Sequence, residues 1–137
     1  LASRTAPTVL TPHDGELARL GADTDDPDRI GVTRALAATL GAVVLRKGST
    51  TVVAAPDGAV LLATAGDARL ATAGTGDVLA GMIGALLAQG ADPRQAVHAA
   101  VWLHGAAADD FGADIGLVAT DLAPLAARRL ARLRAPV

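Results

Sequence analysis

Residues 71–90 read ATAGTGDVLAGMIGALLAQG, a glycine-rich turn that leads directly into an apolar stretch. Glycine costs conformational entropy, and a carboxylate beside an apolar segment needs a partner or a purpose. We predict a helix from Gly76 to Gln89, with the backbone N–H groups of Gly74, Thr75 and Gly76 forming an anion hole at its N-terminus. On spacing alone, a tight turn with Asp77 as a first-turn carboxylate is an equal alternative.

The turn matches neither of the two common phosphate-binding loops. A dinucleotide fingerprint needs G-x-G-x-x-G, and here the next glycine after Gly76 is Gly81, which comes too late. A Walker A loop needs Gly-Lys-Ser/Thr, which is absent. The anion that the turn would hold is therefore not specified by either pattern.

Outward from this turn, strand and helix patterns alternate in the first half of the chain and helices dominate the second. This order predicts an α/β layered domain. We expect strands at Pro7–Leu10 and 42–47, a hairpin over 50–64 turning at PDG, and helices over 15–22, 29–41, from Pro93 onward and after a cap at Thr120 or Asp121. His98 and His104 are expected to be helix-packing residues, and Trp102 a core residue.

Composition limits the class of protein. The chain has 137 residues, 51% hydrophobic and 1% aromatic, which suffices for one domain with a core. A net charge of −2 predicts no general attraction to nucleic acid or to anionic membranes. The absence of cysteine and of a long apolar run fits a cytoplasmic protein. Because residue 1 is Leu, we expect a piece of a longer protein.

Two polar segments follow predicted strands. Lys47 is the only lysine, and with Gly48, Ser49, Thr50 and Thr51 it is placed to grip a phosphate at a strand's carboxyl end. A surface lysine before a hairpin is the alternative. His13, in TPHDGE, is either a ligand-binding or acid/base group, or a turn residue.

Taken in order, five segments resemble the ADP- or ATP-dependent NAD(P)H-hydrate dehydratases of the ribokinase-like superfamily. They are TPHDGE (11–16), VVLRKGSTTVVAAPDG (43–58), LATAGTGDVLAGMIGALLAQG (70–90), AVWLHGAAAD (100–109) and GLVATDL (116–122). Asp14 stands where the family usually has proline. The resemblance implies a ribokinase-like three-layer α/β/α fold, with residues 1–137 forming the C-terminal portion of a single dehydratase domain.

The resemblance also implies residue roles. Asp77 is the base that takes the proton of the substrate hydroxyl, and His13 contacts the hydrated NADH or NADPH. Gly74, Thr75 and Gly76 form the anion hole; the nucleotide site is lined by Lys47, Gly48, Ser49, Thr50, Thr51 and Gly76.

ADP or ATP would be the co-substrate, with Mg²⁺ held through its phosphates rather than by a set of protein ligands, and the protein would be a homo-oligomer. The rival hypotheses are a ribokinase-like small-molecule kinase, which TPHDGE disfavours, and a non-catalytic fragment that self-associates.

Overall fold

The computed structural model describes residues 4–134 and divides into two compact units. The first contains the chain up to Ala63 together with Asp92–His98, and the second contains Thr64–Ala91 and the chain from Ala99 onward. The predicted alternation of strands and helices is confirmed in the first unit and the predicted helical half in the second.

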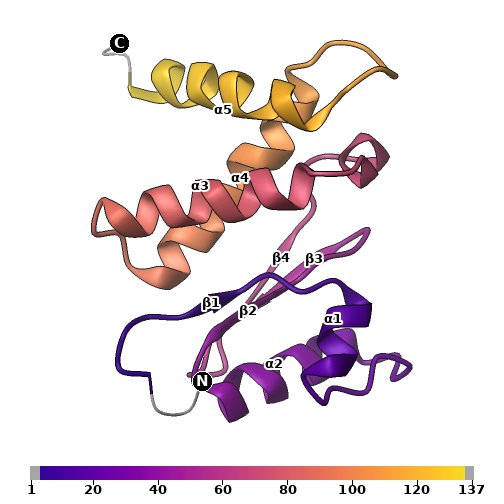
Figure 1. Cartoon of the computed structure of the whole chain (residues 1–137), viewed down its shortest axis with the longest axis vertical. Helices are drawn as coiled ribbons and strands as arrows, with labels where there is room; N and C mark the ends of the chain where they lie inside the picture. The colour runs from indigo at the N-terminus through magenta and orange to yellow at the C-terminus, as the bar shows by residue number, and fades with distance from the viewer. Residues whose placement is uncertain (1–3, 135–137) are drawn as a thin grey trace. The chain divides into compact units, whose positions relative to one another are not determined.

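The first unit is built on a four-stranded mixed sheet in the order β1-β2-β3-β4. Strands β1 (Val9–Leu10) and β2 (Val43–Arg46) are parallel, whereas β3 (Thr51–Ala54) and β4 (Val60–Ala63) continue the sheet as an antiparallel hairpin. Helix α1 (Asp14–Arg19) follows β1 directly, and α2 (Arg29–Leu40) packs against β2 and β3 (Figure 1). The parallel pairing matters for function because the carboxyl ends of β1 and β2 meet at one edge of the sheet.

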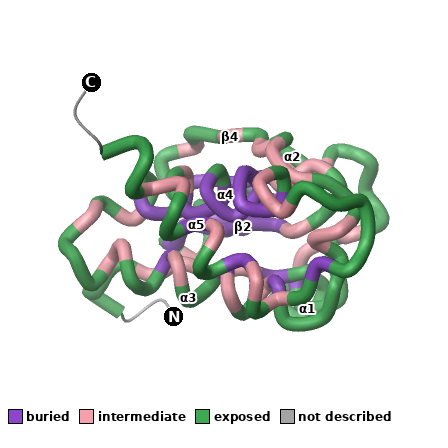
Figure 2. Tube along the Cα trace, turned by 90° about the horizontal axis from the view of Figure 1, so that it is seen from above, coloured by how far each residue is buried: buried purple, intermediate pink, exposed green. Residues whose placement is uncertain are grey.

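Local signals explain these elements. All of β2 is buried (Figure 2), as its unbroken apolar run predicts. The Asp28 side chain accepts from the Gly31 N–H and starts α2, which ends at Gly41 in the left-handed conformation with φ 60°. The core of this unit joins both helices to the sheet through Leu17, Leu36, Ala37, Val44 and Ala54.

The second unit is helical. A short 3₁₀ turn, η1 (Ala68–Ala71), precedes α3 (Thr75–Ala88), and α3 packs against α5 (Ala119–Arg134). Helix α4 (Pro93–Asp109) begins in the first unit and from Ala99 belongs to the second. The core of this unit consists of Ala107, Ala108, Leu117, Leu122 and Ala126.

Two expectations about the helical half are wrong. Helix α5 begins at Ala119, before the expected cap, and the Asp121 carboxylate instead reaches back to accept from the Val118 N–H. Trp102 is 43% exposed rather than in the core, and the Arg129 guanidinium lies 5.5 Å from its ring centroid, within the range of a cation–π contact. Within residues 4–134, no helix is long and apolar enough to cross a membrane.

Candidate functional site

The first part of the candidate site lies where β1 and β2 end. The TPHDGE segment (residues 11–16) follows β1 and the RKG segment (residues 46–48) closes β2. A backbone hydrogen bond from the Lys47 N–H to the Pro12 carbonyl, 3.0 Å long, joins them. Parallel pairing therefore places the two segments side by side, although 34 residues separate His13 from Lys47 in the sequence.

His13 is fixed in place by the helix it starts. Its Nδ1 accepts from the Glu16 N–H at 3.2 Å, and the Glu16 carboxylate accepts from the His13 N–H at 2.9 Å. This reciprocal pair is a capping box, here with histidine in the place usually taken by Ser or Thr. Nδ1 is thereby engaged with the backbone, and the ring remains exposed to solvent.

Glu16 connects the two segments. Its carboxylate lies 3.6 Å from His13 Nε2 and 3.7 Å from Lys47 Nζ. The hydrogen bond from the His13 backbone N–H, followed by the charge of Lys47, lowers the pKa of Glu16 below its usual 4.5. The structure thus brings the predicted dinucleotide-contacting His13 and the predicted nucleotide-binding Lys47 around one ionised carboxylate.

A buried arginine, Arg46, is linked to the TPHDGE segment through Asp14. Arg46 is 1% exposed, and its Nε donates to Asp14 Oδ1 at 2.7 Å. Asp14 also accepts from Arg29 Nη1 at 3.3 Å, so one carboxylate bridges two guanidinium groups. The Arg46 contact is the largest cause that lowers the pKa of Asp14 below its usual 3.8. Arg46 Nη1 has no hydrogen-bond partner among the described residues.

Sequence reasoning missed this carboxylate–arginine network. The one available signal is a charged side chain at the end of the otherwise apolar VVLR strand, which needs a buried partner. Arg29 also donates to the Lys47 carbonyl at 3.4 Å and lies over Gly48, where any Cβ would overlap its guanidinium group. Of the remaining predicted nucleotide-binding residues, Gly48 and Ser49 are exposed and Thr50 and Thr51 are half-buried.

The second part of the candidate site is the GTGD turn (residues 74–77), in the second unit. Gly74 adopts the left-handed conformation with φ 86° and is the N-cap of α3. Thr75 is buried, and its hydroxyl lies 2.6 Å from the Leu70 carbonyl and 2.9 Å from the Thr72 carbonyl. These contacts tie the start of α3 to the turn that precedes it.

The backbone N–H groups of the turn differ in their use. Thr75 N–H donates to the Thr72 carbonyl at 3.3 Å, and Asp77 N–H donates to the Gly74 carbonyl at 3.1 Å. Within residues 4–134, the N–H groups of Gly74 and Gly76 donate to no protein acceptor. Unsatisfied N–H groups at a helix N-terminus are the donors that an anion needs. Asp77 itself is exposed in the first turn of α3.

A buried histidine contacts the turn from α4. His104 Nε2 lies 2.9 Å from the Thr75 carbonyl oxygen, and the side chain is buried. Burial lowers the pKa of His104 below its usual 6.5. The helix-packing role expected for His104 is confirmed, with an added polar contact. The next residue, Gly105, leaves no room for a Cβ because the Ala65 backbone packs directly on it.

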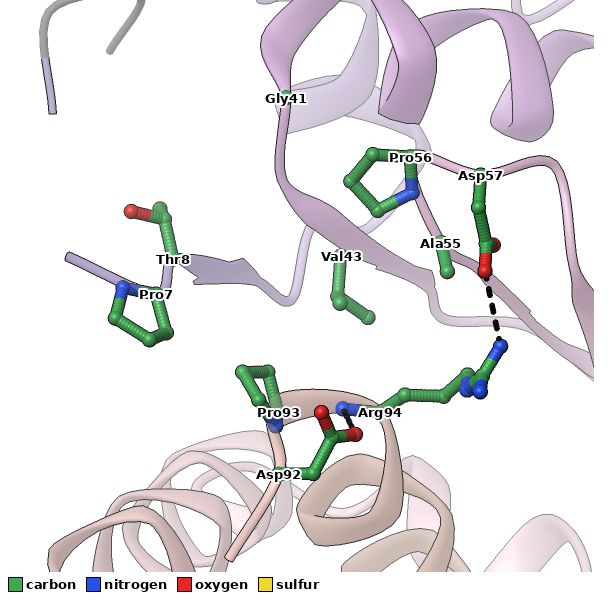
Figure 3. Close-up of a pocket in the computed structure, with 10 residues that line it drawn as sticks. All are labelled: Pro7, Thr8, Gly41, Val43, Ala55, Pro56, Asp57, Asp92, Pro93 and Arg94. Atoms are coloured by element: carbon green, nitrogen blue, oxygen red, sulfur yellow. Dashed lines mark hydrogen bonds and ion pairs between the residues drawn. The ribbon is translucent and has the colours of Figure 1, made fainter. Parts of the chain in front are cut away.

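A hollow in the first unit lies elsewhere. It has a volume of about 300 Å³ and is lined by residues near the amino ends of β1 and β2, among them Thr8, Gly41 and Val43 (Figure 3). An ion pair of 3.1 Å between Arg94 and Asp57 lies at its rim. None of the predicted site residues lines this hollow, so it is not the candidate site.

The comparisons with known proteins place the chain in a family. A family model described as NAD(P)H-hydrate dehydratase matches residues 1–132. The chain belongs to the NAD(P)H-hydrate dehydratase family. It is 47% identical over 125 residues to an ADP-dependent (S)-NAD(P)H-hydrate dehydratase of Neisseria meningitidis, an alignment that covers 86% of this chain and 42% of that protein.

Solved structures confirm the fold. An ADP/ATP-dependent NAD(P)H-hydrate dehydratase from Bacillus subtilis, co-crystallised with ATP and Mg²⁺, matches with a TM-score of 0.86 and 39% identity over 98% of this chain and 52% of that one. A ribokinase-like superfamily protein from Enterococcus faecalis matches with a TM-score of 0.77 and 28% identity, over 94% of this chain and 46% of that one. The ribokinase-like α/β fold is confirmed, and the chain spans about half the length of these relatives.

Proposed function

We propose that the protein is an ADP- or ATP-dependent NAD(P)H-hydrate dehydratase, and that residues 1–137 are the C-terminal portion of its catalytic domain. The observation that carries the proposal is the GTGD turn, where Asp77 stands in the same helical turn as the Gly76 N–H, which has no acceptor among residues 4–134. A carboxylate that can accept a proton, beside the Gly74 and Gly76 N–H groups that can bind an anion, suits the transfer of a phosphoryl group to a hydroxyl.

The reaction divides into two steps. In the first, Asp77 takes the proton of the ring hydroxyl of hydrated NADH or NADPH, and the oxygen attacks the terminal phosphorus of the nucleotide, releasing AMP from ADP or ADP from ATP. The Gly74 and Gly76 N–H groups stabilise charge on the transferred group. In the second, the ring nitrogen lone pair expels phosphate, the C–O bond breaks, and loss of a proton from the adjacent carbon gives NADH or NADPH.

The TPHDGE and RKG segments bind the nucleotide and the dinucleotide and take no part in the chemical steps. Lys47 and the loop Gly48–Thr51 supply a cation and hydroxyl donors for the nucleotide phosphates. His13 presents its exposed ring to the dinucleotide, with its orientation fixed by the capping box. Glu16 keeps Lys47 close to His13, and a bound phosphate competes with that carboxylate for the lysine.

Mg²⁺ fits this proposal as a companion of the nucleotide. The described residues 4–134 contain no group of three or more His, Cys, Asp or Glu side chains arranged to hold a metal ion. A hard cation that keeps most of its waters and binds phosphate oxygens needs no such group. When bound, it neutralises charge on the phosphates during transfer.

The test is a coupled assay with hydrated NADH and ADP on the full-length protein and its Asp77→Asn variant. We expect the wild type to regenerate NADH and release phosphate and AMP, and Asp77→Asn to lower turnover by ~100-fold or more while ADP still binds. Asp114→Asn, in an exposed loop of the same unit, is the matched control.

The same assay separates the rival hypotheses. A small-molecule kinase would leave the phosphoryl group on its product and regenerate no NADH. A non-catalytic protein would show no turnover with either nucleotide. Near wild-type turnover in Asp77→Asn would remove Asp77 from the mechanism. The homo-oligomeric state stays a prediction, which light scattering of the purified protein checks.

A further inference from the structure

His104 is a buried polar residue that the proposed reaction does not use. It lies 7% exposed on α4 with a single polar contact among the described residues, from Nε2 to the Thr75 carbonyl oxygen. A histidine with a lowered pKa is neutral near pH 7 and carries one N–H. Because a carbonyl oxygen only accepts, that N–H must be on Nε2, which fixes the tautomer.

The acceptor belongs to a particular peptide group. The Thr75 carbonyl and the Gly76 N–H are the two ends of one planar trans peptide, and the described chain contains no cis bond. In a trans peptide these two groups point in opposite directions. A donor held on the Thr75 oxygen therefore helps α3, to which both residues belong, to hold the direction in which the Gly76 N–H points.

The same contact also strengthens that donor. A hydrogen bond to a peptide oxygen polarises the group and makes its N–H a better donor, an effect of roughly 10–30% per bond. The Gly76 N–H is one of the two donors of the turn for which the described part of the chain offers no acceptor. We propose that His104 is a positioning residue, which orients and polarises the Gly76 N–H so that it binds the phosphoryl group being transferred.

The surrounding packing makes this arrangement specific. The Thr75 hydroxyl is hydrogen-bonded to carbonyls of the preceding turn, and these bonds hold Thr75 in place at the start of α3. Gly105, the residue after His104, packs directly against the Ala65 backbone, and this close contact holds α4 in place next to His104. The imidazole therefore has little freedom to move away from the Thr75 oxygen. The role in phosphoryl transfer rests on the proposed function, whereas the hydrogen bond and its effect on Gly76 do not.

The test compares two substitutions in the full-length protein. Gln places an amide Nε2 near the position of the imidazole Nε2 and keeps the donor, whereas Leu fills similar space without one. We expect His104→Leu to lower kcat roughly tenfold or more, the scale of a lost buried hydrogen bond, with KM for ADP almost unchanged. His104→Gln should restore most of kcat. His98→Gln, half-buried on the same helix, should have no effect.

A second measurement does not depend on activity. The amide proton of Gly76, in glycine-labelled protein, reports the polarisation of its peptide group by NMR and its response to inorganic phosphate. We expect His104→Leu to move this signal upfield and weaken the phosphate response, and His104→Gln to retain both. In the wild type, nitrogen shifts of His104 should show the Nε2–H tautomer, which is measurable even if the Leu variant does not fold.

The outcomes are distinguishable. A wild type without dehydratase activity overturns the proposed function, and the Gly76 signal then decides the inference by itself. An Nδ1–H tautomer, an unchanged Gly76 signal in His104→Leu, or equal losses of kcat in the Leu and Gln variants would each overturn the inference. Equal losses would mean that the imidazole acts by its shape.

Discussion

The two regions that carry the predicted residues are held in place by different interactions. In the TPHDGE and RKG segments, the links are ion pairs arranged around the exposed carboxylates of Asp14 and Glu16, and only the Arg46 partner of Asp14 is buried. In the GTGD turn, the links are hydrogen bonds from the buried side chains of Thr75 and His104 to backbone carbonyls. Exposed pairs are individually weak and screened by salt, whereas buried hydrogen bonds are costly to lose.

This difference suits the roles proposed for the two regions. Side chains that exchange one ionic partner for another can adapt to a ligand, which is the role proposed for Lys47, where a phosphate would replace Glu16. Donors that stabilise a transition state act best when they are already in place. The comparison therefore predicts that similar substitutions have unequal effects in the two regions, and three experiments test it, beginning with the largest effect.

The sharpest contrast comes from two glycine-to-alanine changes. A Cβ at Gly105 overlaps the Ala65 backbone, which has no room to yield. We expect Gly105→Ala to lower the free energy of unfolding by about 3 kcal/mol, because overpacking outweighs the better helix propensity of alanine. A Cβ at Gly48 overlaps only the end of the flexible Arg29 side chain, and its one backbone neighbour, the Thr50 oxygen, lies at ordinary contact distance. Gly48→Ala should cost less than about 1 kcal/mol.

Denaturant unfolding of both variants measures this contrast. An equal loss of stability would mean that the Arg29 guanidinium is as rigid as the backbone packed on Gly105, and the distinction between the regions would fail. The substitution at Gly105 should also disturb the GTGD turn, because the adjacent His104 contacts the Thr75 carbonyl. The Gly76 amide signal should therefore move in Gly105→Ala and stay in Gly48→Ala.

The next effect concerns Lys47. Removing its ammonium group with Lys47→Ala should weaken ADP binding by roughly 1–3 kcal/mol, the scale of a charge-assisted hydrogen bond. Because the contact is part-exposed, the difference should shrink as salt is added. Calorimetry over a range of salt concentrations measures both quantities. Arg34→Ala removes the same charge from an exposed position on α2 and should leave ADP binding unchanged.

Much of the fold could be predicted because its signals are local. Asp28 and Gly41 bound α2, Asp92 with Pro93 starts α4, and the PDG turn joins β3 to β4 through Gly58 with φ 87°. Each of these signals acts within a few residues of the chain. The expected start of α5 at Thr120 or Asp121 was wrong for an equally local reason. Asp121 can be the third residue of a helix as well as its cap, and its carboxylate here accepts from the Val118 N–H.

The supports of the candidate site could not be predicted in the same way. Arg46 meets Asp14 from 32 residues away, and His104 meets Thr75 from 29 residues away. The sequence indicates that Arg46 needs a partner, but it identifies neither Asp14 nor Thr75 as a partner, since each pairing depends on which elements pack together. The identities of His13, Lys47 and Asp77 came from motifs and stay predictions until the assays above are done. The core position expected for Trp102 was wrong: the side chain is 43% exposed, and the Arg129 guanidinium lies over its ring.

The smallest effect tests the ionic region by pH. Asp14→Asn keeps an oxygen that accepts from Arg46 Nε but removes the charge between the two guanidinium groups. At neutral pH we expect a loss of about 1 kcal/mol in the free energy of unfolding, the upper range for exposed ion pairs, because the Asp14 carboxylate is exposed although its Arg46 partner is buried.

The sign of the pH dependence follows from the folded-state pKa of Asp14, which lies below 3.8. The unfolded chain binds this proton more readily, so the stabilisation from Asp14 is complete well above pH 3.8 and is lost as pH falls through the folded value. Wild type and Asp14→Asn should therefore differ near neutral pH and converge in acid, because the wild-type carboxyl is then also uncharged. Unfolding curves of both proteins from neutral pH to strong acid measure the difference. A gap that stays constant with pH would mean that Asp14 acts through its shape, and the TPHDGE segment would then be held by packing, as the GTGD turn is.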